Sequence, residues 1–179
     1  MERITLYDKT FKTFIPFERI DAAIAQVAAQ LNADFREEDR PIFLGILNGS
    51  FMFMADLLKK IDLNAEALFV KVSSYQGTSS TGTVQEVIGL NANIEGRTVI
   101  LVEDIVDSGK TIVKLSQMLQ AKKPKQVAIC TLFYKPNAYK ESLPINYHGL
   151  EIGNEFIVGY GLDYNGLGRQ YRDIYILDE

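Results

Sequence analysis

The sequence has 179 residues, of which 47% are hydrophobic and 23% are charged, and this fits a single domain. No stretch is long and apolar enough to cross a bilayer, and the first residues lack the pattern of a signal peptide, so we expect a cytoplasmic protein without a membrane partner. Nineteen basic and 23 acidic residues leave a net charge of -4, which argues against a nucleic-acid partner. The single Cys130 cannot form an internal disulfide, and a single histidine excludes a multi-histidine zinc site within one chain.

Helical and strand patterns alternate along the chain, which is typical of a parallel α/β sheet. In chain order we expect a helix at 17–33, a strand at 41–47, a helix at 51–60, strands at 67–72 and 98–102, a helix at 111–120, and strands at 126–133, 156–162 and 174–177. Polar clusters follow several of these strands. Because ligands bind beyond the carboxyl ends of parallel strands, the clusters indicate a binding site there.

Residues 73–82 (SSYQGTSSTG) are almost all small and polar, which predicts a mobile loop. A loop that closes over a site would exclude water during a reaction. A surface loop without any role is the alternative.

The most informative segment is VILVEDIVDSGKT at 99–111. It is not a Walker A loop, because Asp104 stands where the first glycine would be required. Ser108 and Gly109 are small, so backbone N–H groups can converge on an anion at the start of the next helix, where Lys110 and Thr111 follow. Three nearby carboxylates would repel an extended polyphosphate, so a sugar phosphate is the better ligand.

Two of these carboxylates, Glu103 and Asp104, are adjacent at the end of a buried strand, and Asp107 follows. Such a pair can bind ribose hydroxyls and lie beside Mg²⁺, which prefers oxygen ligands. A solvated acidic turn is the alternative interpretation.

A hydrophobic strand followed by EDIVDSGKT resembles the phosphoribosyl pyrophosphate signature of type I phosphoribosyltransferases. The resemblance implies a central, mostly parallel twisted sheet flanked by helices, with a small hood formed by the C-terminal segment and N-terminal residues of one domain spanning 1–179. It implies that Glu103 and Asp104 contact ribose and Mg²⁺, that Asp107 is the catalytic acid or base at purine N7, and that residues 108–111 bind the 5-phosphate.

Other segments resemble the hypoxanthine-guanine branch of that family. In FYKPNAY, Lys135 matches the lysine that donates to the purine 6-oxo group; otherwise it would be an ordinary exposed lysine. In FIVGYGLDYNGLGR, the resemblance implies that Phe156 stacks on the purine, that Ile157 presents backbone groups to it, that Asp163 contacts Mg²⁺ and the base, and that Arg169 reaches pyrophosphate. Phe156 could instead be a core aromatic and Asp163 a turn residue.

Two further segments match pyrophosphate-binding parts of the family. Asn48 and Gly49 match its first pyrophosphate loop, with Asn48 in place of the usual lysine, and a non-proline cis peptide is common there. A plain tight turn is the alternative. Ser74 and Tyr75 match the Ser-Tyr pair of the family's flexible loop.

The sequence therefore predicts a Mg²⁺-dependent enzyme of purine salvage, which joins hypoxanthine or guanine to the phosphoribosyl group of phosphoribosyl pyrophosphate. The resemblance also suggests a homodimer or homotetramer. An enzyme for xanthine or another base, and a regulator that keeps the fold but binds RNA or DNA, are the rival hypotheses.

Overall fold

A computed structural model describes residues 2–72, 87–88 and 92–178 of the chain. Its larger sheet has six strands in the order β5-β4-β3-β6-β7-β8. The neighbours from β4 to β8 are parallel, and the short β5 is antiparallel to β4. The predicted parallel α/β fold is confirmed. The strands are β3 (Ile42–Leu47), β4 (Glu66–Val72), β5 (Val87–Ile88), β6 (Thr98–Val106), β7 (Gln126–Tyr134) and β8 (Tyr147–Glu151).

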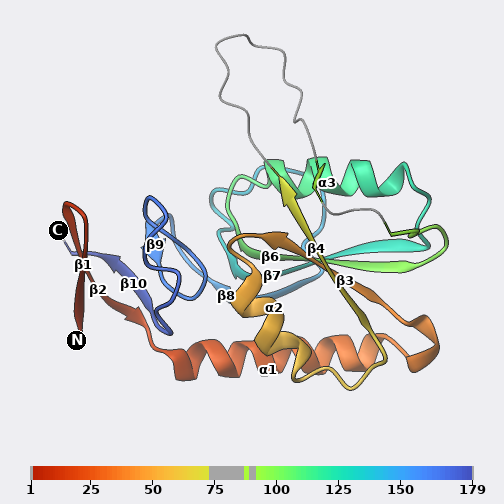
Figure 1. Ribbon diagram of the computed structural model, residues 1–179, viewed down its shortest axis with the longest axis horizontal. Helices are drawn as coiled ribbons and strands as arrows, with labels where there is room; N and C mark the ends of the chain where they lie inside the picture. The colour runs from red at the N-terminus through yellow and green to blue at the C-terminus, as the bar shows by residue number, and fades with distance from the viewer. Residues whose placement is uncertain (1, 73–86, 89–91, 179) are drawn as a thin grey trace, which may run out of the picture.

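Helices cover both faces of this sheet (Figure 1). α1 (Phe17–Asp34) and α2 (Phe51–Leu58) lie on one face, and α3 (Lys110–Gln120) lies on the other. The strands serve both faces because successive side chains point in opposite directions. In β6, Ile100 and Val102 pack with α1 and α2, whereas Val99 and Leu101 pack with α3. A short 3₁₀ helix, η1 (Glu37–Asp39), precedes β3. In the described part of the chain, no helix is long and apolar enough to span a membrane.

A second, smaller sheet joins the two ends of the chain (Figure 1). Its order is β1-β2-β10-β9, all antiparallel, with β1 (Arg3–Leu6), β2 (Lys9–Ile15), β9 (Ile157–Val158) and β10 (Ile174–Leu177). It has its own core, in which Phe11 and Val158 are fully buried. α1 begins directly after β2 and runs from this sheet beneath the larger one.

The small sheet corrects part of the sequence interpretation. The expected strands at 156–162 and 174–177 pair here and not in the larger parallel sheet, and only Ile157–Val158 of the first is a strand. β8 was not predicted, because YHGLE lacks the apolar run of a buried strand. β1 and β2 were not predicted either, because their core is complete only where the two ends of the chain meet.

Candidate active site

Three loops with polar residues meet at the carboxyl edge of the larger sheet. Asn48 and Gly49 follow β3, residues 107–109 follow β6, and Lys135 follows β7. Since β3, β6 and β7 are adjacent and parallel, their carboxyl ends lie at the same edge. The predicted location of the site is consistent with this topology.

The loop after β6 forms a small hollow at the start of α3. Residues 103–112 line it, and its volume is about 140 Å³. Gly109 has a φ of +81°, and a Cβ there would lie 2.3 Å from the Tyr139 ring, so only glycine fits this turn. Ser108, Lys110 and Thr111 are exposed around it. A helix start with a glycine-containing turn and hydroxyl side chains can bind a phosphate.

Glu103 and Asp104 lie inside β6 rather than after it, because the strand continues to Val106. Asp104 is only 8% exposed, and its Oδ1 accepts a hydrogen bond of 3.0 Å from the Ile105 amide. The Glu103 Oε2 is buried and has no hydrogen-bond partner among the described residues. Burial, followed by the adjacent Asp104 carboxylate, raises the pKa of Glu103, and burial also raises the pKa of Asp104. A bound cation or ribose hydroxyls would therefore satisfy groups that the protein leaves incompletely paired.

The loop after β3 packs directly against this acid pair. A Cβ on Gly49 would lie 1.6 Å from the Asp104 Oδ2, so any side chain at residue 49 would displace the carboxylate. On its other side, a Cβ on Gly161 would lie 2.1 Å from the Gly49 carbonyl oxygen. The cis peptide lies between Leu47 and Asn48, one bond before Asn48–Gly49. The backbone of this loop is therefore close to the acid pair.

Lys135 is a buried cation whose amine is held by two oxygens. Only 8% of its side chain is exposed. Its Nζ donates to the Glu155 carbonyl oxygen at 3.0 Å and to the Asp107 Oδ2 at 3.3 Å. The alternative of an ordinary exposed lysine is wrong. A buried amine beside a half-exposed carboxylate is a donor and an acceptor in one place.

A second hollow of about 210 Å³ begins where the first ends, and the two share Asp104, Ile105 and Asp107. Phe156 borders it and is 50% exposed, which excludes the alternative of a core aromatic. The Phe156 ring lies 5.9 Å from Tyr164 and 6.3 Å from Phe11. The other lining residues are Lys135, Ile157, Leu162 and Asp163. This hollow combines an aromatic face with polar groups at one end, as small-ligand sites commonly do.

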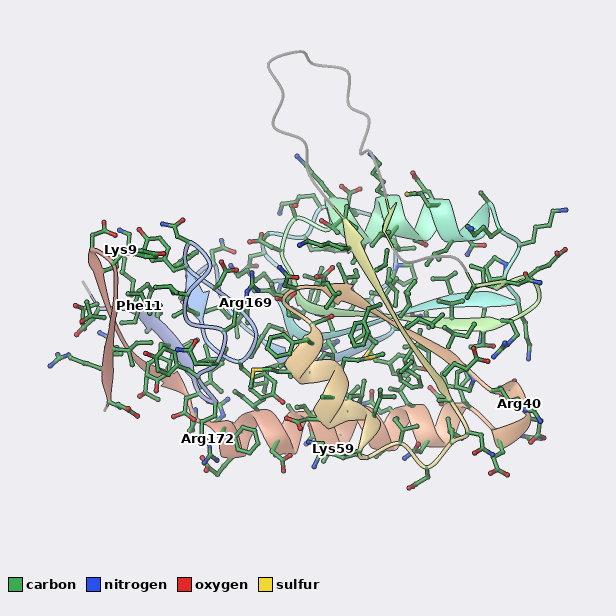
Figure 2. The ribbon with its side chains drawn as sticks, viewed as in Figure 1. Lys9, Phe11, Arg40, Lys59, Arg169 and Arg172 are labelled. Atoms are coloured by element: carbon green, nitrogen blue, oxygen red, sulfur yellow. The ribbon has the colours of Figure 1, made fainter. Side chains whose placement is uncertain are left out.

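Asp163 and Arg169 form an ion pair in the loop that follows β9. The Asp163 Oδ2 also accepts a hydrogen bond of 2.6 Å from the Gly166 amide, and the Arg169 Nη1 donates to the Gly161 carbonyl at 2.6 Å. Figure 2 shows Arg169 in the region between the two sheets. Within residues 2–72, 87–88 and 92–178, no group of three or more His, Cys, Asp or Glu side chains is placed to hold a metal ion by itself.

The structure thus brings most of the expected residues together, and it adds others. Ser74 and Tyr75 lie outside the described residues. Three groups near the site were not predicted from the sequence. They are Tyr139, which packs on Gly109, the Glu155 carbonyl, which accepts a hydrogen bond from Lys135, and Gly161, which lies against Gly49. Two glycines flanking Tyr160 were the available signal of an irregular loop.

The single cysteine and the single histidine of the chain lie outside the site. Cys130 is fully buried in the core, and burial raises the pKa of its thiol. The His148 Nε2 lies 3.4 Å from the Glu151 Oε1 at a partly exposed position.

An α/β sheet with a hollow at a helix start, a buried acid pair and an adjoining hollow with an aromatic face has the shape and the polar groups that a sugar phosphate beside a flat ligand would need. A family model described as a phosphoribosyl transferase domain matches residues 16–165. The chain is 39% identical, over 92% of both sequences, to a hypoxanthine phosphoribosyltransferase of Escherichia coli. It is 44% identical, over 85% of both sequences, to a hypoxanthine-guanine phosphoribosyltransferase of Staphylococcus epidermidis.

A solved structure of a related protein has the same fold as this chain. The crystal structure of a hypoxanthine phosphoribosyltransferase from Staphylococcus aureus superimposes with a TM-score of 0.86 and 39% identity, covering 93% of this chain and 91% of that one. The chain belongs to the phosphoribosyltransferase family.

Proposed function

We propose that this protein is a purine-salvage enzyme that transfers the 5-phosphoribosyl group of phosphoribosyl pyrophosphate to hypoxanthine or guanine, with release of pyrophosphate. The relatives that carry this activity in their names match nearly the whole chain. The observation that carries the proposal is the pair of joined hollows, one at an anion-binding helix start and one with Lys135 beside an aromatic ring. Their junction at Asp104, Ile105 and Asp107 is where ribose would join the base.

The second hollow suits a 6-oxopurine. The purine O6 and N7 lie on the same edge of the base, and Lys135 and Asp107 present a donor and an acceptor 3.3 Å apart. A fixed ammonium donor favours an oxo group over an amino group, because an ammonium can only donate and would face the amino group of a base donor to donor. Phe156 would stack on the base, while Ile157 and Asp163 would contact its other edge.

The first hollow would hold the phosphoribosyl group. The backbone N–H groups of residues 108–111 would bind the 5-phosphate, and Glu103 and Asp104 would hold the ribose hydroxyls as positive charge develops on the sugar. The backbone of Asn48 and Gly49, together with Arg169, would bind pyrophosphate, as would Ser74 and Tyr75. Asn48 is neutral, whereas the family usually has a lysine at this position. Backbone N–H groups would therefore provide more of the pyrophosphate binding.

The reaction we propose is a single displacement, in which the purine N9 attacks ribose C1 and pyrophosphate leaves. Asp107 would accept or relay a purine proton from its place between the two hollows. The described side chains alone cannot surround a metal ion, yet Mg²⁺ commonly binds through one or two carboxylates plus substrate oxygens. The unpaired Glu103 Oε2, with Asp104 and Asp163, fits such a shared site. Mg²⁺ would supply neutralising charge at the leaving pyrophosphate.

The small sheet and the loop after β9 would form the hood over the base, because they contribute Phe156, Ile157 and Asp163 to the second hollow. We place the enzyme in the cytoplasm as one domain that assembles into a homodimer or homotetramer. Light scattering after size exclusion would give the number of subunits.

Pyrophosphate release from phosphoribosyl pyrophosphate tests the function directly. Hypoxanthine, guanine, xanthine and adenine are offered separately, with Mg²⁺ and with a chelator. We expect Mg²⁺-dependent turnover of hypoxanthine or guanine and none of adenine. Turnover of xanthine alone would assign a different substrate, and no turnover of any base would leave a binding or regulatory protein.

A further inference from the structure

The loop that leaves β9 has three consecutive residues with positive φ. Gly159, Tyr160 and Gly161 have values of 103°, 46° and 98°. Glycine tolerates these angles, but a tyrosine there is strained, and such a residue persists only where its surroundings hold it in place. Tyr160 is nevertheless one of the largest fully buried side chains, with 1% exposure.

Tyr160 is held by its side chain and by its backbone. Its hydroxyl donates a hydrogen bond of 2.5 Å to the Asp56 Oδ2 on α2, and its amide donates to the Tyr171 carbonyl at 2.7 Å. The ring lies 6.0 Å from Phe17 at the start of α1. Burial, followed by the hydrogen bond to Asp56, raises the pKa of Tyr160, so its hydroxyl remains a donor at neutral pH. The loop after β9 is therefore held against α2 by the Tyr160 side chain.

The next residue connects this fastening to the pyrophosphate side of the site. Gly161 lies against the Gly49 carbonyl. The Gly161 amide donates a hydrogen bond to the Arg169 carbonyl at 3.0 Å, and the Gly161 carbonyl accepts one from the Arg169 Nη1 at 2.6 Å. Gly49 in turn precedes α2, the helix that carries Asp56. The hydrogen bond between Tyr160 and Asp56 can thus affect the position of two groups that we propose bind pyrophosphate. These are the loop at Asn48–Gly49 and the Arg169 guanidinium.

We propose that Tyr160 is a positioning residue for the pyrophosphate end of the substrate, which acts through its hydrogen bond to Asp56. The bond fixes Gly161 and Arg169 against the Gly49 backbone before the substrate arrives. Preformed geometry of this kind lowers the cost of ordering a site on binding. The inference rests on the proposed function, because pyrophosphate is the group that these residues meet.

The test compares Tyr160→Phe with Tyr147→Phe. Both changes remove a buried hydroxyl that donates to an aspartate, since the Tyr147 hydroxyl donates to the Asp34 Oδ2 at 2.8 Å. Tyr147 begins β8, pairs with Cys130 in the middle of β7, and lines neither of the two hollows. For Tyr160→Phe we expect the KM for phosphoribosyl pyrophosphate and the Kd for magnesium pyrophosphate each to rise about tenfold, the scale of a lost hydrogen bond to a charged group. The KM for the base should change by less than about twofold, as should every constant of Tyr147→Phe.

Changes at Asp56 provide the rescue experiment. Asp56→Asn keeps an oxygen acceptor for the Tyr160 hydroxyl and should retain most of the affinity, whereas Asp56→Ala should match Tyr160→Phe. The double variant Tyr160→Phe/Asp56→Ala should be no worse than either single variant, because both remove the same bond. The proposal is overturned if Tyr160→Phe behaves like Tyr147→Phe, or if it raises the two KM values equally. Calorimetric binding of pyrophosphate needs no turnover, so a failure of the proposed function would be seen separately in the wild-type assay.

Discussion

Replacement of Gly49 by alanine is the sharpest test of how the site is packed. The added Cβ would lie 1.6 Å from the Asp104 Oδ2, 2.4 Å from its Cγ and 2.9 Å from its Oδ1. Ordinary contact requires 3.4–4 Å, so the carboxylate or the loop must move by roughly 2 Å. Asp104 lies inside β6 and cannot shift with its backbone without disturbing the sheet.

We expect two measurable effects of Gly49→Ala. Overpacking of this kind destabilises a protein by about 1–3 kcal/mol, which denaturant unfolding of the ligand-free protein would detect. Misplacement of a substrate-binding group by an ångström or more lowers kcat/KM by about 100-fold, which the pyrophosphate-release assay would measure.

A second variant identifies the cause. In Gly49→Ala/Asp104→Ala the clashing carboxylate is gone, so the double variant should regain most of the stability that Gly49→Ala loses. The reasoning is refuted if Gly49→Ala keeps kcat/KM within about threefold of wild type, or if removal of the Asp104 carboxylate restores no stability.

Four further results are expected. Asp107→Asn should lower the forward rate by about 100-fold, and a rate within about threefold of wild type would exclude a general-base role. Lys135→Met should lower kcat/KM for hypoxanthine by about 10- to 100-fold and weaken the preference over adenine, as measured with both bases. Burial raises the Asp56 pKa, but hydrogen bonds from Lys59 and Tyr160 outweigh this and lower it overall, so its stabilising effect exists above about pH 4 and disappears as the pH falls through the lowered value. The stability advantage of wild type over Asp56→Asn should therefore vanish in unfolding experiments at acidic pH. Finally, Cys130 should react with a thiol reagent only after unfolding, because the thiol of the folded protein is buried and its pKa is raised. If the folded protein reacted as fast as a free thiol does, the burial of Cys130 would be contradicted.

The helices were predicted almost to their ends because each has a local signature. Apolar residues on one face gave the helix at 17–33, and the structure has α1 at Phe17–Asp34. The segment at 111–120 likewise corresponds to α3 at Lys110–Gln120. The central strands were recognised as continuous apolar runs, since strands buried on both faces need them. The turn before α3 was predicted from its small residues, and its binding of a phosphate remains a proposal.

The small sheet could not be predicted from local sequence patterns. Strands β1 and β2 have mixed polar sequences, and the small core that their buried residues form is completed by residues more than a hundred positions away, such as Tyr175. The local pattern of apolar residues does not indicate which distant strand will pair with these two. The strand at 174–177 was recognised as a strand, but its sheet was not, because pairing is a long-range choice.

The sequence by itself determined the α/β class, the positions of the three α-helices and of the strands β3, β4, β6 and β7, and the residue types of the candidate site, because these follow from local periodicity and turn chemistry. Only the tertiary structure decided how those residues meet. It placed the Asp104 carboxylate against Gly49, buried the Lys135 amine between Glu155 and Asp107, and fastened the loop after β9 to α2 through Tyr160. Each of these contacts joins segments that are distant along the chain, so the free energy that selects them comes from packing across the fold and not from the propensity of any one segment.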